Sequence, residues 1–333
     1  MSSSQSLSFM SSSAPLRVVL SRDSAESEHL VDVAIVDEHG LVGSHGSADR
    51  PVIPRSAIKP IQVLPLVRTG AAAAFKVTDE ELALGAASHS GEEAHIEAVE
   101  AWLARIGLDP SALECGAADP ISDDAYEQHI RAGGTKAPIL SCCSGKHTGF
   151  LTIAQHLGVD PAGYVERDHP VQQLIIDVVA EFTGVDLESM SSGIDGCGIP
   201  TFALPLHALA RSMATLVRPL GDANTVSAAK TVSSALAENP YWISGTDRQE
   251  MRLADAALEP LVSKTGAEGV FMAALPDRGI GIALKARDGA RRGADMAMFA
   301  VLETLGATTP GLAIHDVTNA AGTVVGTMQV HTS

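Results

Sequence analysis

The sequence predicts an α/β (α+β) fold in which both ends of the chain contribute to one antiparallel sheet and the middle portion is helical. Short apolar runs rich in β-branched residues occur near the N-terminus, and similar runs return after residue 269. Between them, apolar residues recur at the spacing of amphipathic helices. One sheet faced by a helical portion is the simplest arrangement that buries these faces.

The N-terminal part of the sheet is predicted from three apolar runs. Residues 16–21 and 31–36 are strand-like, and residues 37–40 form a turn that leads into a third run at 41–44. The last two runs therefore predict a hairpin. Pro51 ends the strand pattern because proline cannot donate to a ladder.

Helix signals fill the middle of the chain. Thr78 and Glu81 have the spacing of a capping box. Residues 171–182 place their apolar side chains on one face, and Pro170 suits the first turn of that helix. Further helices are predicted at residues 92–106, 202–217, 225–237 and 248–261.

The end of the chain returns to strands. Residues 269–275 and 279–286 are predicted strands joined by a Pro-Asp-Arg turn. Residues 292–305 predict a helix, and residues 322–330 a last strand. The C-terminal runs can therefore complete a sheet begun at the N-terminus.

The domain prediction follows from this order. The Ser-rich residues 1–14 lack a basic region followed by an apolar run, so we expect a disordered tail rather than a signal peptide. Residues 15–330 are expected to form a single domain. Its sheet would use residues 15–46 and 267–330, and its helical part residues 56–262.

Composition excludes several classes of partner. The chain of 333 residues carries 23 Lys+Arg and 40 Asp+Glu, a net charge of −17, which disfavours nucleic-acid backbones and anionic membranes. Four cysteines are too few for a disulfide scaffold of this length. No apolar run reaches the ~18 residues of a transmembrane helix. We expect a cytoplasmic enzyme that acts on a small molecule.

The first chemical motif is Arg55-Ser56-Ala57-Ile58-Lys59-Pro60. Ser56 and Lys59 would lie one helical turn apart on the same face. A lysine takes a proton from serine only if its pKa falls from about 10.4 toward 7. The pattern is common by chance, and an ordinary surface lysine is the alternative.

Two further motifs extend this pattern. Ser-Lys-Thr-Gly, which contains Lys264, follows Ser-x-x-Lys in the order found in β-lactamases and penicillin-recognising proteins. Ala-Ser-His-Ser-Gly-Glu, which contains Ser88, lies at the position along the chain where those proteins carry Ser-x-Asn. The asparagine is missing, which argues against β-lactam chemistry. A turn and a helix N-cap are the structural alternatives for these two segments.

Thiols gather in two glycine-rich turns. Cys143 lies in Cys-Cys-Ser-Gly-Lys-His, and Cys197 lies in Gly-Ile-Asp-Gly-Cys-Gly-Ile-Pro. The two could hold a soft metal, zinc by default, with His147, Lys146 or Asp195 completing the shell. Buried free cysteines are the alternative, because no Cys-x-x-Cys pair is present.

Together, the five motifs resemble the asparaginase II family, the rhizobial-type or class 3 L-asparaginases. The resemblance runs from about Arg17 to about Val330, nearly the whole chain. It implies a serine β-lactamase-like fold, a homodimer, and hydrolysis of L-asparagine to L-aspartate and ammonia.

The resemblance also implies the site residues. Its two Ser–Lys pairs correspond to Ser56 with Lys59 and Ser88 with Lys264, and Lys285 on the following strand is the alternative to Lys264. It implies one zinc ion per chain, which positions the substrate. The implied zinc ligands are Cys143, Lys146 and Cys197, and the implied substrate-binding residues are Arg55, His147 and Asp195.

The mechanism expected on this basis is acyl transfer in two steps. Ser56, deprotonated by a neutral Lys59, attacks the side-chain amide, and water hydrolyses the acyl-enzyme with help from Ser88 and Lys264. Ser88 is the alternative nucleophile. The alternatives to an asparaginase are a glutaminase, a β-lactamase or peptidase, and a non-catalytic, zinc-dependent amino-acid-binding protein.

Overall fold

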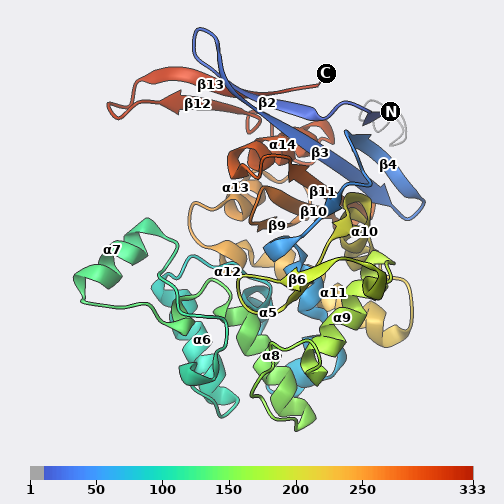
Figure 1. Ribbon diagram of the computed structural model, residues 1–333, viewed down its shortest axis with the longest axis vertical. Coiled ribbons are helices and arrows are strands. Elements are labelled where there is room, and N and C mark those ends of the chain that lie inside the picture. Colours follow the sequence, from blue (N-terminus) through green and yellow to red (C-terminus); the bar gives the residue numbers. More distant parts are fainter. Residues whose placement is uncertain (1–10, 333) are drawn as a thin grey trace. The chain divides into compact units, whose positions relative to one another are not determined.

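The computed structural model describes residues 11–332, which form two compact units (Figure 1). The sheet unit consists of residues 11–57, 203–218 and 253–332, and the helical unit of Ile58–Phe202 and Pro219–Arg252. The sequence assigned the sheet and the helices to two portions of one domain; the contacts separate them into two units. The predicted tail lies outside the described residues as far as residue 10, but Ser11 and Ser12 form a paired strand.

One sheet dominates the sheet unit. Its main strand order is β12–β13–β2–β3–β11–β10–β9, with β4 pairing β3 and β1 pairing β4. Every pairing is antiparallel except that of β1 with β4. The strands are β1 (Ser11–Ser12), β2 (Leu16–Ser21), β3 (Ala25–Asp37), β4 (Gly40–His45), β9 (Val262–Gly266), β10 (Val270–Leu275), β11 (Ile280–Ala286), β12 (Ile314–Thr318) and β13 (Val324–His331).

The predicted fold class is confirmed, because strands from both chain ends share this sheet. In Figure 1, the blue strands β2 and β3 lie beside the red hairpin of β12 and β13. The predicted hairpin at 31–44 is β3 and β4, and the strands predicted at 269–275 and 279–286 are β10 and β11. The short strands β5 (Pro51–Val52) and β8 (Leu204–Pro205) form a separate pair.

Two helices pack on this sheet, α10 (Leu206–Val217) and α14 (Arg291–Thr304). Ile280, Ile282 and Leu284 join the same apolar cluster as the α14 side chains. Gly281, between them, approaches α10 so closely that a Cβ there would lie 2.0 Å from the Ala210 carbonyl oxygen. Because side chains alternate along a strand, α14 and α10 cover opposite faces of β11.

The structure differs from the prediction at two places in this unit. The Lys-Thr-Gly segment lies in β9, an edge of the main strand path, although the predicted C-terminal part of the sheet begins only at residue 267. The helix predicted at 248–261 is shorter and forms α13 (Gln249–Ala256), directly after which Ala257 pairs with Thr308. Strand β12 was not predicted, because most of its residues are exposed and lack an apolar alternation. It is held instead by pairing with β13.

The helical unit is built around α8, whose residues 144–154 are all buried. Helices α3, α4, α5, α6 and α9 contact it. The helices of this unit are α2 (Lys59–Gln62), α3 (Leu64–Arg68), α4 (Ala71–Ala74), α5 (Asp79–Gly85), α6 (Glu93–Arg105), α7 (Asp123–Arg131), α8 (Ser144–Leu157), α9 (Pro170–Thr183), α11 (Ala223–Glu238) and α12 (Pro240–Ser244), with a strand pair of β6 (Ser192–Ile194) and β7 (Pro200–Phe202).

The predicted start signals of two of these helices are confirmed. The Thr78 side chain accepts a hydrogen bond from the Glu81 backbone, and Glu81 accepts one from the Thr78 backbone, which completes the capping box of α5. Helix α9 begins at Pro170, directly after its N-cap residue His169.

Helix α8 carries two glycines for which opposite effects of substitution are expected. A Cβ at Gly145 would lie 2.5 Å from the Leu84 carbonyl oxygen, on the backbone of α5. We expect Gly145→Ala to lower the free energy of unfolding by about 2 kcal/mol, because the two helices must move apart. Urea denaturation monitored by circular dichroism measures this change.

Gly149 provides the matched control one turn later. A Cβ there would lie 3.6 Å from Leu66 and 3.8 Å from Trp102, which is ordinary van der Waals contact. Gly149→Ala is therefore expected to raise the free energy of unfolding by about 0.5–1 kcal/mol, since alanine is the better helix former. Equal effects of the two substitutions would contradict the close approach of α5 and α8.

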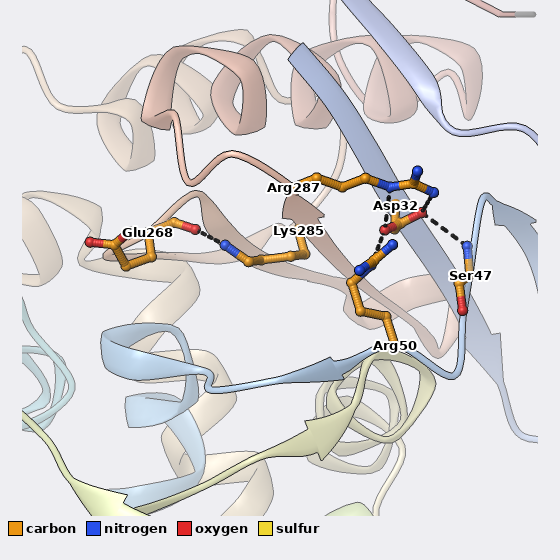
Figure 2. Close-up of polar contacts among 6 residues, drawn as sticks. All are labelled: Asp32, Ser47, Arg50, Glu268, Lys285 and Arg287. Carbon is orange, nitrogen blue, oxygen red and sulfur yellow. Dashed lines mark hydrogen bonds and ion pairs between the residues drawn. The ribbon is translucent and has the colours of Figure 1, made fainter.

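A buried carboxylate joins three segments of the sheet unit. Asp32 on β3 is fully buried and accepts hydrogen bonds from the Ser47 backbone at 3.0 Å, from Arg50, and from two Arg287 nitrogens at 3.0 and 2.7 Å (Figure 2). Burial alone would raise the pKa of Asp32, but the hydrogen bonds from Arg287, Ser47 and Arg50 outweigh it and lower the pKa.

Replacing Asp32 with asparagine is expected to lower the free energy of unfolding by about 3 kcal/mol at pH 7, because two arginines lose their shared anion. The stabilisation is present above the unfolded-state pKa of about 3.9 and is lost as the pH falls through the lower folded-state pKa. The difference between the two proteins should therefore shrink only below about pH 4. The exposed Asp316→Asn variant is the control, and an Asp32→Asn protein as stable as wild type at pH 7 would refute this role.

Candidate active site

Ser56 and Lys59 lie on one continuous helical segment. The 3₁₀ helix η2 (Arg55–Ile58) runs directly into α2, whose first residue is Lys59. The boundary between the two units falls between Ala57 and Ile58. Arg55, at the start of the segment, has φ = 51°, a left-handed backbone that is uncommon for a residue other than glycine. Such strained positions concentrate at functional sites.

The Lys59 ammonium is the centre of a buried cluster in the helical unit. Lys59 is 1% exposed, and its Nζ donates to the Ala87 carbonyl oxygen, to Ser88 Oγ at 3.1 Å and to Cys143 Sγ at 3.2 Å. Lys59 therefore contacts the serine that the sequence assigned to the second Ser–Lys pair. It also contacts one of the predicted zinc ligands.

Backbone hydrogen bonds hold Ser88 at this position. The segment after α5 is anchored by the Ser88 N–H, which donates to the Ile243 carbonyl oxygen at 2.9 Å. The next N–H, of His89, donates to the Cys142 carbonyl oxygen at 3.2 Å. The loop that carries Ser88 is thus pinned to the turn before α8 and to α12.

Three neighbouring thiols raise the pKa of Lys59. Burial lowers the pKa of Lys59, but the neighbouring Cys143, Cys142 and Cys197 thiols outweigh it, so the pKa is raised. Hydrogen bonds from Cys142 and Cys197 hold the pKa of Cys143 well below its ordinary value, and Lys59 adds to this effect. Both shifts favour the charged form of Lys59 and of Cys143, whereas the sequence-based mechanism requires a neutral lysine.

The three predicted zinc ligands come together in the helical unit. Lys146 Nζ, on α8, lies 2.9 Å from the sulfur of Cys197, on the turn between β6 and β7. Cys197 donates its thiol hydrogen to Cys143, and this bond raises its pKa. Two thiols and one amine form a soft donor set of the kind that zinc accepts, provided that the amine is neutral. Within residues 11–332, no group of three or more His, Cys, Asp or Glu is arranged to hold a metal, so this set depends on a lysine.

His147 lies beside this cluster with one nitrogen unpaired. It is fully buried, and Nδ1 lies 2.7 Å from the Tyr164 hydroxyl, whose oxygen also accepts a hydrogen bond from the Glu114 backbone. Burial holds the pKa of His147 well below 6.5, so the ring is neutral. Because Tyr164 donates to Nδ1, we assign the proton to Nε2, which has no hydrogen-bond partner.

Sequence reasoning missed a second buried histidine. His89 Nδ1 accepts from the Gly91 backbone at 3.2 Å, and Nε2 lies 2.8 Å from Ser144 Oγ. Burial lowers the pKa of His89 to about 3, so it is neutral and donates to Ser144. His89 and Ser144 each lie in one of the five motifs quoted above. Their place in these motifs is the sequence signal that could have identified them.

The remaining predicted site residues, Asp195, Lys264 and Lys285, each donate a hydrogen bond to a backbone carbonyl oxygen. Asp195 closes the turn before Cys197, where its backbone N–H donates to the Ile199 carbonyl oxygen at 2.8 Å. Lys264, on β9 in the sheet unit, is fully buried and donates to the Thr265 carbonyl oxygen at 2.8 Å. Lys285, the alternative, donates to the Glu268 carbonyl oxygen, as Figure 2 shows. The pairing of Ser88 with either lysine stays a prediction.

Comparison with known families gives one match, to the family described as L-asparaginase II, over residues 18–330. Comparison with curated proteins finds no match. Across the described residues 11–332, no helix is long and apolar enough to cross a membrane.

Several solved structures align at low similarity. A β-lactamase from Mycobacterium bovis has a TM-score of 0.44 and 13% identity, covering 83% of this chain and 94% of its own. A putative β-lactamase from Bacteroides dorei has a TM-score of 0.45 and 12% identity, covering 88% and 94%. A structure of Mglu in its tris and glutamate form has a TM-score of 0.38 and 17% identity, and the alignment covers 82% of this chain and 58% of Mglu. At these scores, the alignments carry no inference about the site or its substrate.

Proposed function

We propose that this chain, which belongs to the L-asparaginase II family, hydrolyses L-asparagine to L-aspartate and ammonia. Family membership implies an amidohydrolase, and the choice of asparagine as the substrate is our proposal. The observation that carries the proposed chemistry is the hydrogen bond from Lys59 Nζ to Ser88 Oγ at 3.1 Å, one helical turn after Ser56. A buried lysine that donates to a serine suits nucleophilic catalysis, and the same lysine is the proposed proton carrier for Ser56.

In the first step, Ser56 Oγ bonds to the side-chain carbonyl carbon of asparagine, and the bond from that carbon to nitrogen breaks. Lys59 gives one proton to the leaving nitrogen as the Ser56 hydroxyl proton replaces it. Ammonia leaves, and Lys59 ends with the protons it began with. This exchange starts from a cationic lysine, the state that the neighbouring thiols favour.

In the second step, a water oxygen bonds to the acyl carbon as the ester bond to Ser56 breaks. One water proton returns to Ser56, and the aspartate carboxyl group releases the other to solvent. Ser88, which accepts a hydrogen bond from Lys59, helps to orient the water and move its proton. Lys264 is the proposed partner of Ser88 in this step.

We assign the binding of the substrate α-amino and α-carboxylate groups to the residues around Cys143 and Cys197. Cys143, Lys146 and Cys197 would hold one zinc ion, whose positive charge would attract the substrate α-carboxylate. The unpaired Nε2–H of His147 is a second donor suited to a carboxylate. Arg55 and Asp195 are the proposed partners of the remaining charges of the substrate. A homodimer with one zinc ion per chain is part of the same proposal.

Ammonia release from L-asparagine and L-glutamine tests the proposed substrate. We expect kcat/KM for asparagine to exceed that for glutamine by about tenfold or more, since one methylene is worth about 1–3 kcal/mol in a fitted pocket. A preference for glutamine would make the protein a glutaminase. Asparagine binding without ammonia release would make it a non-catalytic amino-acid-binding protein.

A further inference from the structure

The loop that carries Ser88 contacts the end of α12, and both segments belong to the helical unit. Besides the bond from the Ser88 N–H to the Ile243 carbonyl oxygen, the Ser90 hydroxyl donates to the Ser244 carbonyl oxygen at 2.7 Å. Carbonyl groups in the last turn of a helix have no partner within that helix. The Ser88 loop therefore supplies donors that the end of α12 lacks.

Glu92 adds its side chain to this contact. It is the N-cap residue of α6, where Ser, Thr, Asp and Asn are preferred, yet its side chain makes no capping hydrogen bond to α6. Instead, its carboxylate accepts hydrogen bonds from the Thr246 backbone N–H at 2.9 Å, from the Thr246 hydroxyl at 2.9 Å and from the Tyr241 hydroxyl at 3.1 Å. The carboxylate thus joins α6 to residues 241–246.

Tyr241 is bound to the same segment through its ring and its backbone. Burial and the neighbouring Glu92 carboxylate raise the pKa of Tyr241 to about 12, so its hydroxyl keeps its proton and donates. Its ring stacks on His95 of α6 with 4.8 Å between the ring centroids, and its carbonyl oxygen lies 3.3 Å from His95 Nε2. Hydrogen bonds to a charged acceptor are stronger than neutral ones, so Glu92 is the strongest link in this contact.

Gly245 allows the two segments to approach each other. Its backbone has φ = 111° and ψ = −178°, a conformation that is adopted almost only by glycine. A Cβ at this position would lie 2.5 Å from Glu92 Oε1 and 2.7 Å from Ser90 Oγ. A side chain at residue 245 would therefore displace both Glu92 and Ser90.

The contact bears on Ser88 more than on Lys59. The Ala87 carbonyl oxygen and Cys143 Sγ both accept hydrogen bonds from Lys59. Ala87 is held by α5, because its N–H donates to the Leu84 carbonyl oxygen at 3.1 Å, and Cys143 directly precedes α8. Loosening the contact with α12 would therefore displace Ser88 and leave Lys59 in place.

We propose that Glu92 is a positioning residue, which holds Ser88 within hydrogen-bond distance of Lys59. It does so by binding the Tyr241 hydroxyl and the backbone and hydroxyl groups of Thr246. This role rests on the proposed function, in which Ser88 orients the water that hydrolyses the acyl-enzyme. Glu92 acts through the loop that carries Ser88.

The Glu92→Ala variant should therefore slow the second step of the reaction and spare the first. We expect the rate constant for hydrolysis of the acyl-enzyme to fall by about tenfold or more, because Ser88 no longer has a fixed position. The rate constant for the first release of ammonia, and with it kcat/KM, should change by less than about threefold. Rapid-quench assays of ammonia and aspartate separate the two steps, since ammonia leaves first and aspartate leaves second.

Three further variants test where the effect comes from. Gly245→Ala disturbs the contact from the other segment and should give the same difference between the two steps. Glu92→Gln should recover most of the loss, because its amide oxygen accepts from the Thr246 backbone and the two hydroxyl groups can accept from its NH₂. Glu93→Ala, at the exposed next residue, is the matched control and should have wild-type rates. Equal losses in both steps of Glu92→Ala, or wild-type rates in both, would overturn the proposal.

Hydrogen exchange tests the position of Ser88 without an activity assay. In Glu92→Ala, the backbone amides of Ser88 and His89 should exchange about tenfold faster than in wild type, and those of α9 at the same rate in both proteins. NMR or mass spectrometry measures these rates, and unchanged exchange at both amides would overturn the proposal. A wild-type protein that releases no ammonia, but shows this difference in exchange, would refute the proposed function and not the link from Glu92 to Ser88.

Discussion

Replacing Ser56 with alanine or Lys59 with methionine is expected to lower the rate of ammonia release from L-asparagine by at least about a hundredfold. Ser56→Ala removes the oxygen that forms the acyl bond. Lys59→Met keeps most of the side-chain volume but removes the group that exchanges protons and that contacts Ser88 and Cys143. A coupled assay of ammonia, with kcat and KM determined separately, measures both losses.

Two control variants test this expectation further. Lys59→Arg keeps a cation beside Cys143, but guanidinium does not give up a proton, so a large loss in kcat is expected here too. Lys230→Met, at an exposed position of α11, should retain wild-type activity. If Ser56→Ala kept more than about a tenth of the wild-type rate, Ser56 would not be the nucleophile, and Ser88 would take its place.

Replacing Cys143 or Cys197 with serine is expected to reduce bound zinc from about one ion per chain to below about a tenth, because serine does not supply a thiolate. Mass spectrometry of the metal content of the purified protein measures this loss without reference to activity. The KM for asparagine should rise by about tenfold or more if zinc positions the substrate.

Cys142→Ser is the matched control, because Cys142 adjoins Cys143 and its sulfur lies 3.9 Å from that of Cys143. It should keep its zinc. Zinc lost from Cys142→Ser but retained by Cys143→Ser would shift the ligand by one residue. A wild-type protein purified without zinc, and active without it, would refute the proposed metal site altogether.

The elements that depend on local sequence signals were predictable. The starts of α5 and α9 were predicted from the capping box and from Pro170, which involve residues three or fewer positions apart. Such residues interact with the backbone of their own helix turn. The hairpin of β3 and β4 follows in the same way from an apolar alternation and a turn. Strand β12 carries no such signal, because its stability comes from β13 rather than from its own apolar pattern.

Non-local contacts in the site were not predictable. Lys59 and Ser88 are 29 residues apart, and Lys59 and Cys143 are 84 apart, so no spacing rule relates them. The sequence paired Ser88 with Lys264, which stays a prediction, and it did not relate Ser88 to Lys59. The charge of Lys59 was missed for the same reason, since it depends on thiols from three distant positions.

That a serine carries the acyl group through the reaction is tested most directly by trapping it. The wild-type protein is mixed with L-asparagine, quenched with acid within milliseconds, digested and analysed by mass spectrometry. We expect an aspartyl ester on the peptide that contains Ser56, absent from the Ser56→Ala protein. Rapid ammonia release with no adduct on Ser56 or Ser88 would instead mean direct attack by water and would contradict covalent catalysis.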